Sequence, residues 1–269
     1  MMNQASGKDT RPFEAAAAWY QDSTARHPTH AADEIGREFY LVCLNKAGRL
    51  EDSILEGRSY LSSVVHGEFR PSLEVVRNAP EVNGEVLAGL GKAFKLVEES
   101  IKKGAPPSDK LKAAIETELG YGAGKPAPAG LDYAKAALEV STRYYEAGFA
   151  QDFEYYPGIV SVYNNYEKGD AERAERLAPM VWQSCERAGG KEAGDYWCLS
   201  TQTELSLILN KNADLLELLP RMLARADVGW MLSSTVSKMT TLCAARDMAG
   251  QDTRALHHVI DALNARLDR

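Results

Sequence analysis

The sequence predicts an all-α protein, and three observations lead to that prediction. Apolar residues recur at helical spacing, as they do at Ala174, Ala178 and Val181, which places them on one face of a helix. Short breaks rich in glycine and asparagine separate such segments. Alternating apolar and polar runs rich in valine, isoleucine and threonine, which are typical of half-buried strands, are nearly absent.

The helical segments follow one another along the chain between short breaks. Glycine and asparagine end a helix through the left-handed conformation, and aspartate or serine begins the next one. Because these breaks are short, we expect neighbouring helices to be antiparallel. The breaks lie at residues 46–48, 104–107, 168–170, 189–190, 210–212 and 249–250.

Three of the turns share one pattern, a glycine, four polar-leaning residues and then a small residue, at 48–53, 169–174 and 250–255. Glycine lets the chain reverse, and the small residue lets the second helix lie close to the first. This is the turn inside a tetratricopeptide (TPR) helix pair, although the separations are close to multiples of about 40 residues instead of the usual ~34. We therefore expect a TPR-like helix-pair solenoid of roughly twelve antiparallel helices.

One break is long: residues 120–130 read GYGAGKPAPAG, with four glycines and two prolines. Such a composition is typical of a linker or hinge. We therefore predict a flexible N-terminus over residues 1–10, an N-terminal helical half over 11–119, a linker over 120–130 and a C-terminal TPR-like half over 131–269.

Composition excludes several classes of protein. The 269 residues carry a net charge of −7 and a pI of about 5.4, which argues against general binding to nucleic-acid phosphates. No run approaches the roughly 18 apolar residues that a membrane span needs, and the polar start lacks the apolar core of a secretory signal. The four cysteines show no CxxC spacing, so we expect reduced thiols and a cytoplasmic protein.

A family resemblance rests mainly on the segment from Tyr144 to Leu209. Its motifs YEAGF at 145–149, YYPGI at 155–159 and GDYW at 194–197 resemble the divergent TPR module called the TRAFs-binding domain. That module occurs in apoptosis signal-regulating kinases and in bacterial signalling and conflict proteins. In the N-terminal half, LNKAGR at 44–49 and LGKAFK at 90–95 resemble its first turn and its Gly-Arg-x-x-Lys segment.

The chain also departs from that family. Lys92 stands where the family usually has arginine, and Val160 stands where it often has asparagine after the paired tyrosines. If that asparagine helps to hold a ligand, Asn164 or Asn165 takes its place one turn later. The fused kinase, TIR or protease-like domains of the family are absent from this sequence.

The resemblance implies a cytoplasmic, bacterial scaffold that regulates an effector protein. Bacterial members have also been suggested to sense nucleotide-derived ligands. Lys92 and Lys95, three residues apart on one helix face, are candidates with Arg143 to bind such an anion. The alternative is a solvated basic face interleaved with glutamates.

The aromatic cluster between residues 144 and 166 is dense. Most of its rings should pack in the core, but we place Tyr155, Tyr156 and Asn164 on a ligand- or partner-binding surface. Alternatively, Tyr156 marks only the start of a helix, because Pro157 suits a first helical turn.

The sequence offers no catalytic motif. The segment 120–125 fails the phosphate-loop pattern, because Leu119 and Pro126 occupy positions that need glycine and serine or threonine. We find no HExxH motif, no Cys/His cluster of zinc spacing and no nucleophile elbow, and we predict no cofactor. The predicted function is a non-enzymatic adaptor or regulator that binds a partner protein through its concave face. The alternative is a sensor of a small nucleotide-derived anion.

Overall fold

The computed structural model describes residues 9–27, 34–65, 73–77, 79, 81–122 and 124–267, and these residues form helices and no strand. The all-α prediction is therefore confirmed. Most of the predicted flexible N-terminus, residues 1–8, lies outside the described residues. The helices form two compact units, which divide between Asp152 and Phe153.

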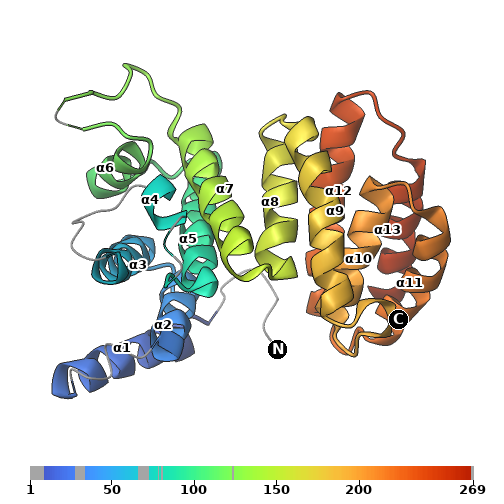
Figure 1. Ribbon diagram of the computed structural model, residues 1–269, viewed down its shortest axis with the longest axis horizontal. Coiled ribbons are helices and arrows are strands. Elements are labelled where there is room, and N and C mark those ends of the chain that lie inside the picture. Colours follow the sequence, from blue (N-terminus) through green and yellow to red (C-terminus); the bar gives the residue numbers. More distant parts are fainter. Residues whose placement is uncertain are drawn as a thin grey trace. The chain divides into compact units, whose positions relative to one another are not determined.

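The first unit is organised around α5, which packs against α2, α3 and α7. Val86, Leu90 and Phe94 follow one another at intervals of four residues and are fully buried, so one face of the helix enters the core. Asn83 caps this helix, since its side chain accepts the Glu85 N–H at 2.8 Å. The helices of this unit are α1 (Arg11–Arg26), α2 (Glu34–Lys46), α3 (Leu50–Val64), α4 (Leu73–Arg77), α5 (Gly84–Lys102), α6 (Asp109–Glu118) and α7 (Tyr133–Asp152) (Figure 1).

Helices α5 and α7 lie unusually close to each other because glycines meet where they cross. A β-carbon added to Gly148 would lie 2.8 Å from the carbonyl oxygen of Gly84. Further along, the rings of Phe94 and Tyr144 stack with centroids 5.8 Å apart. The pair α5–α7 therefore forms the most extensive helix–helix contact in this unit.

We expect Gly148→Ala to destabilise the protein by about 1–3 kcal/mol, because the new methyl group meets backbone that has no freedom to move aside. Gly89→Ala is the matched control in α5, where a β-carbon would sit 3.5 Å from Leu41, an ordinary contact. That change should be neutral or stabilising by up to about 1 kcal/mol. Urea denaturation distinguishes them, and equal midpoints for the two variants would contradict the close crossing.

The division between the units lies beyond the segment predicted as a linker. Helix α7 follows residues 120–130, yet Ala137, Val140 and Tyr144 enter the same core as α5. Residues 120–130 therefore join α6 to α7 within one unit, and the chain passes to the second unit at Phe153, which adopts a left-handed φ of 56°. Glycine and proline in this segment indicate a turn, and only packing decides which unit a helix joins.

The second unit contains α8 (Tyr155–Glu167), α9 (Ala171–Arg187), the short 3-10 helix η2 (Gly190–Glu192), α10 (Tyr196–Ile208), α11 (Asn212–Ala224), α12 (Gly229–Met248) and α13 (Arg254–Leu267). Consecutive helices pack as α8 with α9, α10 with α11 and α12 with α13, and α12 also packs against α8. The turn glycines Gly48, Gly169 and Gly250 all have left-handed φ values, so the predicted turns fall where helices end. The regular TPR-like stack stays a prediction.

Candidate functional site

The six residues predicted to bind a ligand or partner belong to the two units, three in each. In the first unit, Lys95 of α5 already has a partner, because its Nζ lies 3.1 Å from Oε2 of Glu98, whose side chain is only 1% exposed. Arg143 of α7 forms an ion pair with Glu139 at 2.8 Å. Both cations are thus partly neutralised. Lys92 is half-buried on α5, and no ion pair to it is found within the described part of the chain.

The other three predicted residues lie on α8. The Tyr155 hydroxyl donates to Oδ2 of Asp195 at 2.5 Å, and burial followed by this hydrogen bond raises the tyrosine pKa. Asn164 is buried, whereas Tyr156 is 43% exposed. Of the three, Tyr156 has the side chain most available to a partner.

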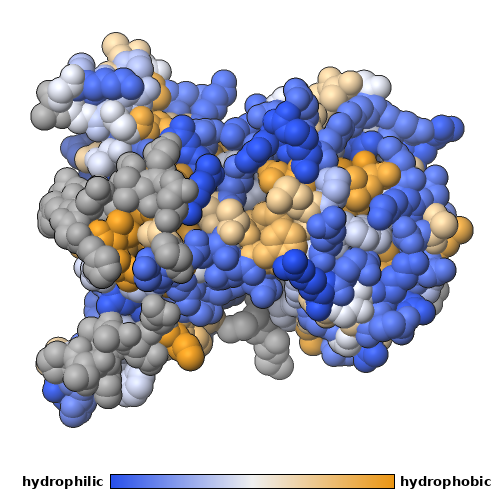
Figure 2. All heavy atoms as spheres, in the orientation of Figure 1, coloured by the Kyte–Doolittle hydropathy of each residue, from blue (hydrophilic) through white to orange (hydrophobic). Residues whose placement is uncertain are grey.

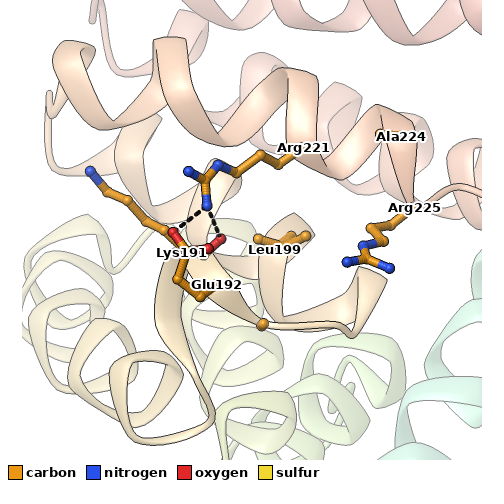
Figure 3. Close-up of a pocket in the computed structure, with 7 residues that line it drawn as sticks. Lys191, Glu192, Leu199, Arg221, Ala224 and Arg225 are labelled. Carbon is orange, nitrogen blue, oxygen red and sulfur yellow. Dashed lines mark hydrogen bonds and ion pairs between the residues drawn. The ribbon is translucent and has the colours of Figure 1, made fainter.

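A pocket of about 340 Å³ opens in the second unit, near η2, α10 and α11 (Figure 3). Its charged lining consists of Lys191, Glu192, Arg221 and Arg225, and Leu199 contributes an apolar wall. Figure 3 shows Arg221 reaching from α11 to the segment that carries Lys191 and Glu192. This volume lies at the lower end of the range of small-molecule sites.

Most positive charge in this pocket is already balanced. Lys191 pairs with Asp214 at 2.7 Å and with Glu217 at 2.8 Å, and these contacts raise the pKa of Lys191 to about 12. Arg221 donates to Glu192 Oε1 at 2.5 Å. The guanidinium of Arg225 makes no ion pair with any described residue, so it is the lining cation best placed to meet an anion.

An exposed apolar stripe runs along α2. Ile35, Phe39 and Val42, spaced at i, i+4 and i+7, are 78%, 63% and 39% exposed, so they share one helix face. We call these three residues the α2 stripe. Helices α1 and α3, which pack against α2, each expose one more large apolar side chain, Trp19 and Leu55. The buried face of α2 carries Tyr40, Leu41, Cys43 and Leu44.

The centre of the second unit is polar. Glu204 of α10 is 1% exposed, and its Oε1 accepts the Ser200 hydroxyl at 2.9 Å. Ser200 in turn hydrogen-bonds Thr235 of α12 at 3.0 Å, and Thr235 lies 2.9 Å from the Tyr196 hydroxyl. Burial raises the pKa of Glu204. Because this network is buried, we interpret it as a structural link between helices.

The four cysteines are buried and unbridged. The Sγ of Cys198 donates to the carbonyl oxygen of Cys185 at 3.6 Å. A hydrogen bond between the two thiols raises the pKa of Cys185 and lowers that of Cys198. Neither thiol is open to solvent, which makes this pair a poor nucleophile for a substrate.

One group of side chains in the described residues has the donor atoms to hold a metal ion: Cys243, Asp247 and His257. Sequence reasoning missed it, because the ligands come from two helices and include a carboxylate. The i, i+4 spacing of Cys243 and Asp247, followed by a glycine turn and a histidine, was the available signal. The α2 stripe was missed as well, because α2 is apolar on several faces and spacing does not say which face is covered.

Most of the surface in Figure 2 is hydrophilic, and hydrophobic patches interrupt it on this face. Within the described residues, no helix combines the length and apolar character that crossing a membrane requires. No family model matches the chain, and no curated protein or solved structure matches it either.

Proposed function

We propose that this protein is a non-enzymatic helical adaptor that binds a partner protein, and that the α2 stripe is part of the docking surface. The observation that carries the proposal is the exposure of Ile35 and Phe39, both of which are more than half exposed to solvent. Large apolar residues that gather on one exposed helix face are typical of interaction sites.

The packing of α2 supports this assignment. Its buried residues already contact α1 and α5, and Asn45 Nδ2 donates to the Gly89 carbonyl oxygen at 2.9 Å. These contacts fix the helix, so its free face is presented on a rigid element. Anchors at i, i+4 and i+7 are the pattern by which a helix docks into an apolar groove. A partner that offers such a groove is the occupant we propose, and the TRAFs-binding-domain resemblance points to an effector protein.

Phe39→Glu tests the proposal. A charge in the centre of an apolar interface should lower partner affinity at least 10–100-fold, since hot-spot residues contribute about 2 kcal/mol or more. The free energy of unfolding should stay within about 0.5 kcal/mol of the value for the unmodified protein, because the side chain is exposed. The measurement is quantitative co-purification of tagged protein from its native host.

Leu216→Glu is the matched control for that experiment. Leu216 is 77% exposed on α11 of the second unit, so the substitution adds the same charge at a similarly exposed leucine outside the α2 stripe. It should leave the recovered partner unchanged. If both variants recover the partner as well as the unmodified protein does, the α2 stripe is not the docking surface.

A second candidate function, a sensor of a small nucleotide-derived anion, is favoured by Arg225, which lines the pocket and makes no ion pair with any residue that the structure describes. No aromatic side chain is found among the described residues that line it, so it suits a phosphate or carboxylate better than a stacked base. Nucleotides, ADP-ribose and inorganic phosphate should raise the Tm in a concentration-dependent manner, and Arg225→Ala should abolish the rise. An unmoved Tm at millimolar ligand would reject this function.

A further inference from the structure

Three side chains of different chemistry converge where α12 turns into α13. Cys243 and Asp247 lie one helical turn apart on α12, and His257 comes from the first part of α13. The Sγ of Cys243 lies 3.4 Å from Nε2 of His257 and 3.8 Å from Oδ2 of Asp247. One donor atom from each residue falls within 4.8 Å of the others.

These separations fit the ligand set of a tetrahedral metal ion. With zinc bonds of about 2.3 Å to sulfur, about 2.0 Å to nitrogen and about 2.1 Å to oxygen, tetrahedral angles place sulfur about 3.5 Å from nitrogen and about 3.6 Å from oxygen. The observed 3.4 and 3.8 Å differ from these values by a few tenths of an ångström. The third pair, the Asp247 carboxylate oxygen and the His257 ring nitrogen, lies within 4.8 Å, and a shared tetrahedral ion requires these two atoms to approach to about 3.4 Å.

The turn between the helices holds the Asp247 carboxylate in place and begins the helix that carries His257. The Thr253 hydroxyl donates to Oδ1 of Asp247 at 2.7 Å, which leaves Oδ2 directed to Cys243. The carbonyl oxygen of Thr253 accepts the backbone N–H of His257 at 3.0 Å, an ordinary helical hydrogen bond that places the backbone of His257 in the first turn of α13. The contact of Thr253 with the Asp247 carboxylate is of the kind that orients a ligand in a metal site.

The alternative interpretation of these residues is a Cys-His-Asp catalytic triad. A triad needs the carboxylate on the far nitrogen of the histidine, where it orients the ring. Here Asp247 hydrogen-bonds Cys243 and Thr253, and no Asp247–His257 hydrogen bond is found among the described residues. The carboxylate therefore stands beside the sulfur, as a second ligand would.

We propose that Cys243, Asp247 and His257 bind a divalent transition-metal ion of the zinc class, with the fourth position left to water or another ligand. A thiolate and an imidazole exclude the hard cations Mg²⁺ and Ca²⁺, which prefer oxygen. One thiolate and one carboxylate neutralise the two charges of the ion. Arg246, the neighbouring cation on α12, donates to the Leu207 carbonyl oxygen at 3.1 Å, and its positive charge also acts on Cys243, where it favours the thiolate.

Cobalt substitution tests the proposal on the full chain. After treatment with EDTA, Co²⁺ should bind at one ion per chain and give both the strong visible bands of a four-coordinate ion and a near-ultraviolet thiolate-to-cobalt band. Zn²⁺ should displace it and raise the Tm of the chain. Cys243→Ala should remove the thiolate band, and a cobalt spectrum without that band in the unmodified protein would overturn the assignment.

His257→Gln and His258→Gln form a matched pair, because both histidines are exposed neighbours on α13 and only His257 faces the cluster. His257→Gln should weaken Zn²⁺ binding at least about 10–100-fold in a chelator competition, and His258→Gln should leave it unchanged. Because both substitutions lie at the surface, both variants should fold, as circular dichroism verifies. Equal affinity for the two variants would overturn the proposal even if some metal binds.

Discussion

Arg58→Ala should destabilise the folded protein by about 3–5 kcal/mol, because it removes a guanidinium that pairs with a buried carboxylate. In the first unit, Nε of Arg58 on α3 lies 3.2 Å from Oε1 of Glu118 at the end of α6, and the Glu118 side chain is only 2% exposed. Glu118 also raises the pKa of the buried Tyr144, although burial is the larger cause. Urea denaturation of the purified variant measures the loss.

A double variant separates the value of this ion pair from the penalty of breaking it. Arg58→Met combined with Glu118→Leu should recover most of the lost stability, since apolar side chains of similar volume replace a buried pair at little net change. Arg254→Ala, which breaks the exposed pair with Asp252, should change stability by less than about 1 kcal/mol. A loss in Arg58→Ala as small as in this control would contradict the buried pairing.

Glu204→Gln should stabilise the second unit increasingly as pH rises. Burial raises the folded-state pKa of Glu204 above its ordinary value, so the folded chain keeps a proton that the unfolded chain releases near pH ~4.3. Stability of the unmodified protein therefore falls as pH rises from that value and levels off above the folded pKa. Glutamine keeps the shape and does not titrate, so this fall should disappear.

The measurement is the Tm of both proteins between pH 4.5 and pH 8. The difference should be small at the acid end and should favour Glu204→Gln at the basic end. Glu172→Gln is the control, because Glu172 is an exposed residue of α9 paired with Arg176, and it should give no such trend. A Tm difference for Glu204→Gln that is flat or that reverses with pH would show that the carboxylate ionises normally.

Much of the helical architecture is predictable from local patterns. The glycine turns at 48, 169 and 250 mark where helices end. Five of the eight aromatic residues of the cluster are buried, as expected for most of them: Tyr144, Tyr145, Phe149, Tyr163 and Tyr166. The grouping of helices is not local. Residues 120–130 have the composition of a linker, but α7 packs on α5 because Gly84 and Gly148 allow close approach, and no short-range signal records that contact.

The predicted basic residues illustrate what sequence reasoning leaves open at a site. Helical spacing places Lys92 and Lys95 on one face, but it does not show that Glu98 is buried and shared between Lys95 and Lys102. Similarly, the donors of the proposed metal site span a turn from Cys243 to His257, and their convergence depends on how α13 folds back on α12. These features require packing, which periodicity does not specify.

Site-specific photo-crosslinking at Phe39 tests the adaptor proposal most directly. A benzophenone side chain placed at Phe39 or Ile35, on the same face of α2, should crosslink one discrete protein in the native host, and the same probe at Leu216 should not. The adduct should weaken when unlabelled protein competes and persist when unlabelled Phe39→Glu competes. Absence of a position-specific adduct at both α2 sites, or equal competition by Phe39→Glu, would contradict the proposal that this chain docks a partner through the α2 stripe.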